Sequence, residues 1–236
     1  MKKVILGATG SIGSSLAKKL VDSGEQVHLV GRDETSLSEL ANELNSTFTT
    51  CDVLEENFSE KIVNDLKAEQ VNGLAYCVGS IDLKPLKLTK KSDFMQSFNL
   101  NLVSATEIIK SLADNLKANK GSIVLFSTVA VQQGFPNHAI VSSAKGAVEG
   151  LTLALAAEYA PNIRINCIAP SLTNSKISNF LLKNEKMAES IAKMHPLKRI
   201  GEGEDSASVA KFLLTDESSW ITGQIFGVDG GRSSVA

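Results

Sequence analysis

Short apolar runs alternate along the chain with longer amphipathic segments. The runs are almost continuously apolar, which is typical of strands buried on both faces of a parallel sheet. Strict strand–helix alternation therefore predicts an α/β fold with a doubly wound parallel sheet. We expect strands at Val4–Leu6, Gln26–Val30, Phe48–Cys51, Gly73–Val78, Ser122–Phe126, Ile163–Ile168 and Gln224–Val228. We expect helices at Ser11–Ser23, Glu34–Leu44, Glu55–Ala68, Lys90–Ala118, His138–Tyr159 and Glu204–Leu214, and an irregular helical segment at Lys176–Met194.

Length and charge limit the classes of protein to consider. The 236 residues, 43% of them apolar, suit one domain spanning residues 1–236, without an internal repeat or linker. The formal net charge of −2 provides no broad basic field, so we expect no nucleic-acid partner and no membrane surface as a partner. The basic cluster at residues 84–91 is interpreted as a solvated loop and helix start.

Cysteine usage and the amino-terminal residues indicate the compartment. Cys51, Cys77 and Cys167 are far apart, no CxxC pair exists, and any single disulfide would leave one thiol over. Reduced thiols predict a cytoplasmic protein, and no metal site is expected. The apolar run before the first glycine has three residues, too few for a signal peptide or a membrane span.

A glycine-rich turn joins the first expected strand to the first expected helix. Glycines permit a tight turn and a close approach of the backbone to phosphate, and a helix N-terminus supplies N–H donors and a positive dipole. The alternative is a plain strand–helix turn, but a strand before the turn and a helix after it favour a dinucleotide site. The expected contacts are Gly7, Thr9, Gly10, Ser11, Ile12 and Gly13.

The end of the second strand indicates which dinucleotide binds. An acidic residue there would bond the ribose 2′-hydroxyl, whereas an arginine accommodates a 2′-phosphate. This strand ends in Gly31-Arg32, and Asp33 comes after the arginine. We therefore favour NADP(H), with NAD(H) possible. The alternative is that Arg32 is only a solvated residue at a helix start.

Further motifs, in order along the chain, resemble the short-chain dehydrogenase/reductase family over essentially the whole length. They are Asp52-Val53 after the third strand, Asn101-Leu102 in the long middle helix, Ser127-Thr128 after the fifth strand, Lys145 at the lysine of the family's YxxxK motif, Pro170-Ser171 after the sixth strand, and the carboxyl-terminal segments 196–201, 221–224 and 228–231. The resemblance implies a Rossmann-type sheet of about seven strands. It also implies a homotetramer or homodimer built through the long helices and the last strand, and a lid at residues 171–200.

The resemblance also implies roles for individual residues. Asn101 and Thr128 would be catalytic, with Thr128 in place of the family's serine. Lys145 would hold the nicotinamide ribose hydroxyls and contribute to catalysis. The other implied cofactor contacts are Asp52 and Val53 at the adenine, and Gly79, Pro170, Ser171 and Thr173 towards the nicotinamide.

The departures from the family pattern concern positions that take part in the family's reaction. Val141 stands where the family has its tyrosine, thirteen positions after Thr128, which fits the family's spacing. In the family that tyrosine protonates the carbonyl oxygen, and valine has no transferable proton. Losing a general acid costs a factor of roughly 10²–10⁴ in rate. The family's Asn-Asn-Ala-Gly motif reads Tyr76-Cys77-Val78-Gly79.

Two side chains could replace the missing proton donor. His138 lies seven positions before Lys145, on the same helix face, and imidazole titrates near neutral pH. It could instead lie in the loop, facing solvent or a backbone carbonyl. Tyr76 follows the fourth strand, but a ring packed at the sheet edge is the simpler interpretation. Tyr159 is discounted because it lies at the far end of the helix.

These observations lead to two main functional hypotheses. The first is an NADP(H)-dependent oxidoreductase that acts on a small carbonyl or alcohol through a non-standard active site, with His138 or a water as proton donor. The second is a catalytically weak or inactive nicotinamide-binding sensor or interaction protein on the same fold. Dehydration or isomerisation is a third option. Apolar residues of the lid could line a substrate pocket or simply pack on the domain.

Overall fold

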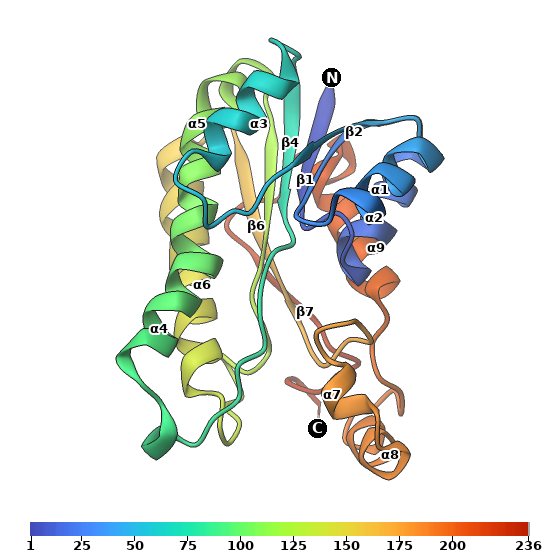
Figure 1. Cartoon of the computed structure of the whole chain (residues 1–236), viewed down its shortest axis with the longest axis vertical. Helices are drawn as coiled ribbons and strands as arrows, with labels where there is room; N and C mark the ends of the chain where they lie inside the picture. Colours follow the sequence, from blue (N-terminus) through green and yellow to red (C-terminus); the bar gives the residue numbers. More distant parts are fainter. Residues whose placement is uncertain (236) are drawn as a thin grey trace.

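The computed structural model describes residues 1–235 and contains one seven-stranded parallel sheet (Figure 1). The strand order β3-β2-β1-β4-β5-β6-β7 confirms the predicted doubly wound Rossmann-type fold. The strands are β1 (Lys2–Leu6), β2 (Gln26–Gly31), β3 (Thr47–Thr50), β4 (Val71–Tyr76), β5 (Ser122–Phe126), β6 (Arg164–Pro170) and β7 (Ile225–Val228). The central strands are buried on both faces, as their continuous apolar runs predicted.

Helices cover both faces of this sheet and enclose two apolar clusters. One face carries α1 (Ser11–Asp22), α2 (Glu34–Glu43) and α9 (Gly203–Leu214). The other carries α3 (Phe58–Leu66), α4 (Lys91–Phe98), α5 (Ser104–Ala118) and α6 (Ala139–Tyr159). By length and composition alone α6 could cross a membrane, but it packs against β5 and β6 as a helix of the core.

Two segments differ from the sequence prediction. The expected helix Lys90–Ala118 is interrupted by a π-helical segment, Asn99–Val103, between α4 and α5. The expected helical segment Lys176–Met194 is two short helices, α7 (Asn179–Leu182) and α8 (Glu185–Lys193). Helical periodicity alone does not reveal a single inserted residue or a break between short helices.

The strand order reverses between β1 and β4, the neighbours at the centre of the sheet. In open parallel sheets, ligands bind beyond the carboxyl ends of the strands at such a reversal. The segments that follow β1, β2, β3, β4, β5 and β6 carry the site residues expected from the sequence. The fold therefore brings these residues to one edge of the sheet.

Candidate active site

The glycine loop turns tightly between β1 and α1. Gly7 has a φ of +75°, and a Cβ there would lie 2.9 Å from the carbonyl oxygen of Cys77. A Cβ on Gly13 would collide with the carbonyl oxygen of Gly7. The Gly10 amide donates to that same Gly7 oxygen at 3.0 Å, which closes the turn. The first amides of α1 lack acceptors within the helix, so they can bind an anion.

The tip of β2 leaves Arg32 accessible. Its side chain is 75% exposed, and Nη1 lies 3.4 Å from Oδ2 of Asp52. Asp33 instead caps α2, because its carboxylate accepts the Ser36 amide at 2.8 Å. That hydrogen bond lowers the pKa of Asp33. The acidic residue next to Arg32 is thus committed to the helix, and the guanidinium is left at the strand end.

Asp52 and Val53 follow β3 at the expected place. The Asp52 carboxylate accepts the Leu54 amide at 3.0 Å through Oδ1, so the turn after the strand is fixed. Val53 is buried, and its carbonyl oxygen accepts the Ser104 hydroxyl at 2.8 Å. This pair joins the turn after β3 to the start of α5.

Lys145, Asn101 and Gly79 meet at the carboxyl end of β4. A Cβ on Gly79 would lie 3.1 Å from both Lys145 Nζ and Asn101 Oδ1. Nζ donates to the Phe126 carbonyl oxygen at 2.8 Å, and burial lowers the pKa of Lys145 to about 8. Among the described residues, the buried Asn101 Oδ1 has no hydrogen-bond partner. Gly79 therefore keeps open a small polar space with one acceptor and an ammonium group.

These features fit a nicotinamide dinucleotide. The first turn of α1 offers amides for a pyrophosphate, and glycine backbone there permits close approach. The space beside Gly79 suits ribose hydroxyls, which can donate to Asn101 Oδ1 and accept from Lys145 Nζ. An unpartnered buried amide oxygen costs free energy unless a ligand or water satisfies it.

The two adjacent hydroxyls after β5 differ in their partners. Ser127 Oγ donates to Glu149 Oε1 at 2.6 Å and is buried, so this hydroxyl is committed to the protein. Thr128 Oγ1 accepts the Ala130 amide at 3.3 Å, which leaves its own proton available to a ligand oxygen. Val141 is buried in the first turn of α6.

His138 is the N-cap residue of α6 and contacts a backbone carbonyl. Its Nδ1 lies 2.8 Å from the Pro136 carbonyl oxygen. Since a carbonyl can only accept, Nδ1 carries the hydrogen, and Nε2 of the neutral ring is an acceptor. The ring also packs edge-on against Phe135, with centroids 5.3 Å apart.

Tyr76 is held inside the protein. Its hydroxyl donates to the Leu100 carbonyl oxygen at 2.7 Å, and burial raises the pKa of this phenol. The side chain thus contacts the π-helical segment, which matches the interpretation of a packed ring at the sheet edge.

A hollow of about 380 Å³ opens beside the start of α6. Its lining includes Lys84, Leu86, Ala130, Phe135, His138 and Ser142. His138 therefore faces this hollow, whereas Lys145 and Asn101 surround Gly79. The structure does not bring His138 into direct contact with that pair.

The segment after β6 is bonded within the protein. Ser171 Oγ lies 2.8 Å from Nε2 of His195, a buried residue at the end of the lid, and Thr173 Oγ1 donates to the Ser171 carbonyl oxygen at 3.1 Å. Pro170 ends β6, and its carbonyl oxygen accepts the Val129 amide at 3.1 Å. The contact with His195 ties the start of the lid to its end.

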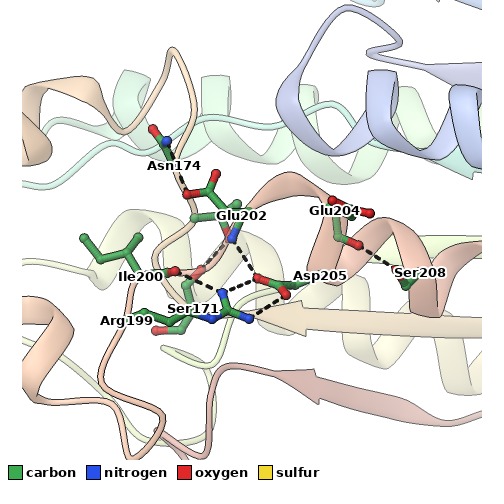
Figure 2. Close-up of polar contacts among 9 residues, drawn as sticks. Ser171, Asn174, Arg199, Ile200, Glu202, Glu204, Asp205 and Ser208 are labelled. Atoms are coloured by element: carbon green, nitrogen blue, oxygen red, sulfur yellow. Dashed lines mark hydrogen bonds and ion pairs between the residues drawn. The ribbon is translucent and has the colours of Figure 1, made fainter.

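Figure 2 shows how the lid rejoins the domain at α9. Nη1 and Nη2 of Arg199 donate to the Asp205 carboxylate, at 2.6 and 2.7 Å. These hydrogen bonds lower the pKa of that carboxyl. The same carboxylate accepts the Glu202 amide at 2.8 Å and so caps the helix. Asn174, near the beginning of the lid, contacts Glu202 at 3.5 Å.

Sequence reasoning missed Glu149 and His195 as partners of predicted site residues. Glu149 lies one helical turn beyond Lys145, so its position on α6 was a usable signal. His195 lies 24 positions from Ser171, and no periodicity links the two residues.

The fold is of the Rossmann class, and the residues at its edge fit a dinucleotide. The sequence model described as enoyl-(acyl carrier protein) reductase matches residues 7–233. The chain belongs to the short-chain dehydrogenase/reductase family. A tropinone reductase homolog of Arabidopsis thaliana is 34% identical to it, over 98% of this chain and 92% of the relative.

Solved structures agree with this assignment. A short-chain type dehydrogenase/reductase from Mycobacterium ulcerans has a TM-score of 0.92 at 26% identity, covering 98% of this chain and 89% of that one. The protein ElxO with NADP bound has a TM-score of 0.91 at 27% identity, covering 99% and 98%. A tyrosine-to-phenylalanine variant of ElxO has been solved with NADPH bound. Relatives of this chain are thus oxidoreductases, and one binds NADP and, as a variant, NADPH.

Proposed function

We propose that this protein is an NADP(H)-dependent oxidoreductase acting on a small carbonyl or alcohol. The observation that carries the proposal is the space beside Gly79, bordered by Lys145 Nζ and the unpartnered Asn101 Oδ1. A buried ammonium and a buried unpaired amide oxygen are costly arrangements unless a polar ligand satisfies them.

Each of these residues has a part in the proposed reaction. When bound, the dinucleotide donates or accepts the hydride. Lys145 and Asn101 would hold the ribose hydroxyls and an ordered water. The free proton of Thr128 would be donated in a hydrogen bond to the substrate oxygen. Fixing both partners in this way lowers the barrier even without a strong acid.

Proton transfer would use His138 or water in place of the family's tyrosine. The contact with Pro136 leaves Nε2 of neutral His138 able to take a proton from an alcohol. In the reverse direction the imidazolium would return that proton. Because His138 lines the outer hollow, a water would connect it to the substrate oxygen.

The preference for NADP(H) rests on Arg32. Its exposed guanidinium is suited to a 2′-phosphate, and Asp33 is occupied in capping α2. The bound NADP and NADPH in ElxO and its variant support this preference.

A nicotinamide-binding sensor is the second candidate. The burial of Val141 favours it, because an apolar side chain lies at the position from which the family donates its proton. A sensor would bind NADPH without oxidising it in the presence of any carbonyl compound, and binding would change its assembly or its partners.

The deciding experiment measures NADPH binding and NADPH oxidation on the same preparation. With a panel of ketones and aldehydes, we expect slow oxidation that is lost in Lys145→Ala and reduced in His138→Asn. Lys183→Ala is the control, because Lys183 is an exposed residue of the lid. Tight binding with no turnover of any compound would reject the oxidoreductase in favour of the sensor.

We also propose that the protein assembles as a homotetramer or homodimer in the cytoplasm. Trp220, before β7, is 98% exposed, and Leu153 on α6 is 52% exposed, which supports burial of these two side chains between copies. Light scattering after size exclusion would give the mass, and Trp220→Ser is expected to lower it. A monomeric mass for the unmodified protein would reject the assembly.

A further inference from the structure

The turn after β7 is held rigidly by one carboxylate. Asp229 accepts the amides of Gly231 and Ser233 at 2.9 and 2.7 Å, and the hydroxyl of Ser233 at 2.6 Å. Partial burial acts to raise the pKa of Asp229, but these hydrogen bonds together outweigh it and the pKa is lowered. Arg232 lies inside this turn, so its backbone is fixed and its side chain extends from a defined point.

Arg232 joins the lid to the loop before α6. Its Nη1 donates to the Met194 carbonyl oxygen, at the end of α8, at 2.9 Å. Its guanidinium carbon lies 5.4 Å from the centre of the Phe135 ring. The carboxyl-terminal segment accordingly lies between the lid helices and the loop before α6 (Figure 1). Arg232 therefore lies beside Phe135, which together with His138 lines the hollow.

The charge of Arg232 is not neutralised within residues 1–235, where no carboxylate lies within 4.0 Å of it. Lys84, which lines the hollow, is by contrast paired with Asp82 at 3.6 Å and Asp93 at 3.1 Å. Arg199 illustrates how a guanidinium binds a carboxylate in this protein, because two of its nitrogens donate hydrogen bonds to Asp205. Arg232 keeps comparable donors for a ligand.

We propose that Arg232 determines specificity by binding the carboxylate of an oxo acid or hydroxy acid substrate. The Phe135 ring contacts both groups. Its centroid lies 5.3 Å from that of the His138 imidazole and 5.4 Å from the guanidinium carbon of Arg232. The carboxylate is therefore separated from the reacting carbon by a short aliphatic chain, which packs against Phe135 and Leu86. This inference rests on the proposed function, because it places the reacting carbon near His138.

The test compares 5-oxohexanoate with its neutral methyl ester. Calorimetry on the NADP⁺-saturated protein measures the binding of each compound without needing turnover. We expect the acid to bind at least about tenfold tighter than the ester. Arg232→Gln should weaken binding of the acid by about 10- to 100-fold and change that of the ester less than twofold. Arg232→Lys should fall between, because it keeps the charge and loses the two-pronged geometry.

Lys183→Gln is the matched control, since it removes the same charge from an exposed lid position and should leave both affinities unchanged. Equal weakening of acid and ester in Arg232→Gln would overturn the inference, because the residue would then serve only to tie the lid. Equal affinity of the unmodified protein for acid and ester would also overturn it. Arg232-dependent binding without oxidation of NADPH would support this inference and reject the proposed reaction.

Discussion

Two regions of the site depend on different parts of the polypeptide. The cofactor edge, formed by the glycine loop, Arg32 and Asp52, relies mainly on backbone amides and on space left by absent side chains. The proposed reaction site, to which we assign Thr128, Val141 and His138, would rely on what each side chain can donate. Backbone amides remain when the side chains around them change, whereas a single substitution can remove a proton donor. A family fold can thus keep its cofactor while its chemistry changes.

Restoring the tyrosine should have the largest effect. Val141→Tyr supplies a proton donor, and we expect turnover of a simple ketone to rise by a factor of roughly 10²–10⁴. NADPH oxidation, followed by absorbance, measures the change. Val141→Phe is the control, because it adds the ring without the hydroxyl. Equal rates for the two variants would mean that ring volume, and not proton transfer, limits the pocket.

The comparison also shows what could be predicted from the sequence. The strands and the glycine loop were predicted correctly, because apolar runs and glycine spacing are local signals. The π-helical segment at Asn101 was not, since one inserted residue hardly alters the periodicity of a long helix. Two contacts join positions that are far apart in the sequence and leave no local signal in it. They are the contact of Ser171 with His195 and that of Arg232 with Phe135. The roles of the predicted site residues stay predictions.

Adding a methyl group to the glycine loop should disrupt cofactor binding. In Gly13→Ala the added Cβ meets the Gly7 carbonyl, so the loop must move. We expect NADPH affinity, measured by fluorescence titration, to fall at least about 100-fold. Gly150→Ala on α6 is the control, because its Cβ meets nothing within 4 Å and should stabilise the protein by up to about 1 kcal/mol. Unchanged NADPH affinity in Gly13→Ala would contradict the assigned phosphate site.

His28 lies on β2, the strand directly before Arg32, and should make the stability of this part of the fold sensitive to acid. The buried ring accepts from Thr47 at 2.9 Å and donates to Thr49 at 3.0 Å, while Lys2 donates to Thr47 and Thr49 donates to Asp65. A protonated ring would place a positive charge in this buried site, close to Lys2, which already donates to Thr47. Burial, with a smaller effect of Lys2, lowers the pKa of His28 to about 4.

A histidine whose folded-state pKa is lowered contributes its full stability above the unfolded pKa of about 6.5, and loses it as pH falls towards 4. Between pH 7 and pH 5 we expect the free energy of unfolding to fall by about 2 kcal/mol from this group. Urea unfolding at the two pH values measures it. His28→Gln should flatten the dependence, whereas the control His138→Asn should keep it. An equal slope in His28→Gln would assign the effect to other groups.

The smallest expected effect concerns the choice of dinucleotide. Arg32→Ala should weaken NADPH binding about tenfold and leave NADH binding within twofold, since only NADPH carries the 2′-phosphate. Lys18→Ala, an exposed cation on α1, controls for general charge. Titration of both reduced cofactors gives the ratio. Equal losses for NADPH and NADH would mean that Arg32 does not read the phosphate.

The π-helical segment at residues 99–103 has a consequence for the evolution of the chain. Deleting one residue there would restore a continuous α-helix and turn α4 by about 100° relative to α5. Asn101 would swing away from Gly79, and Leu100 would leave the hydroxyl of Tyr76. Single-residue deletions in this stretch should therefore be much rarer among homologues than substitutions, because the insertion acts as a spacer that keeps the two helices in phase.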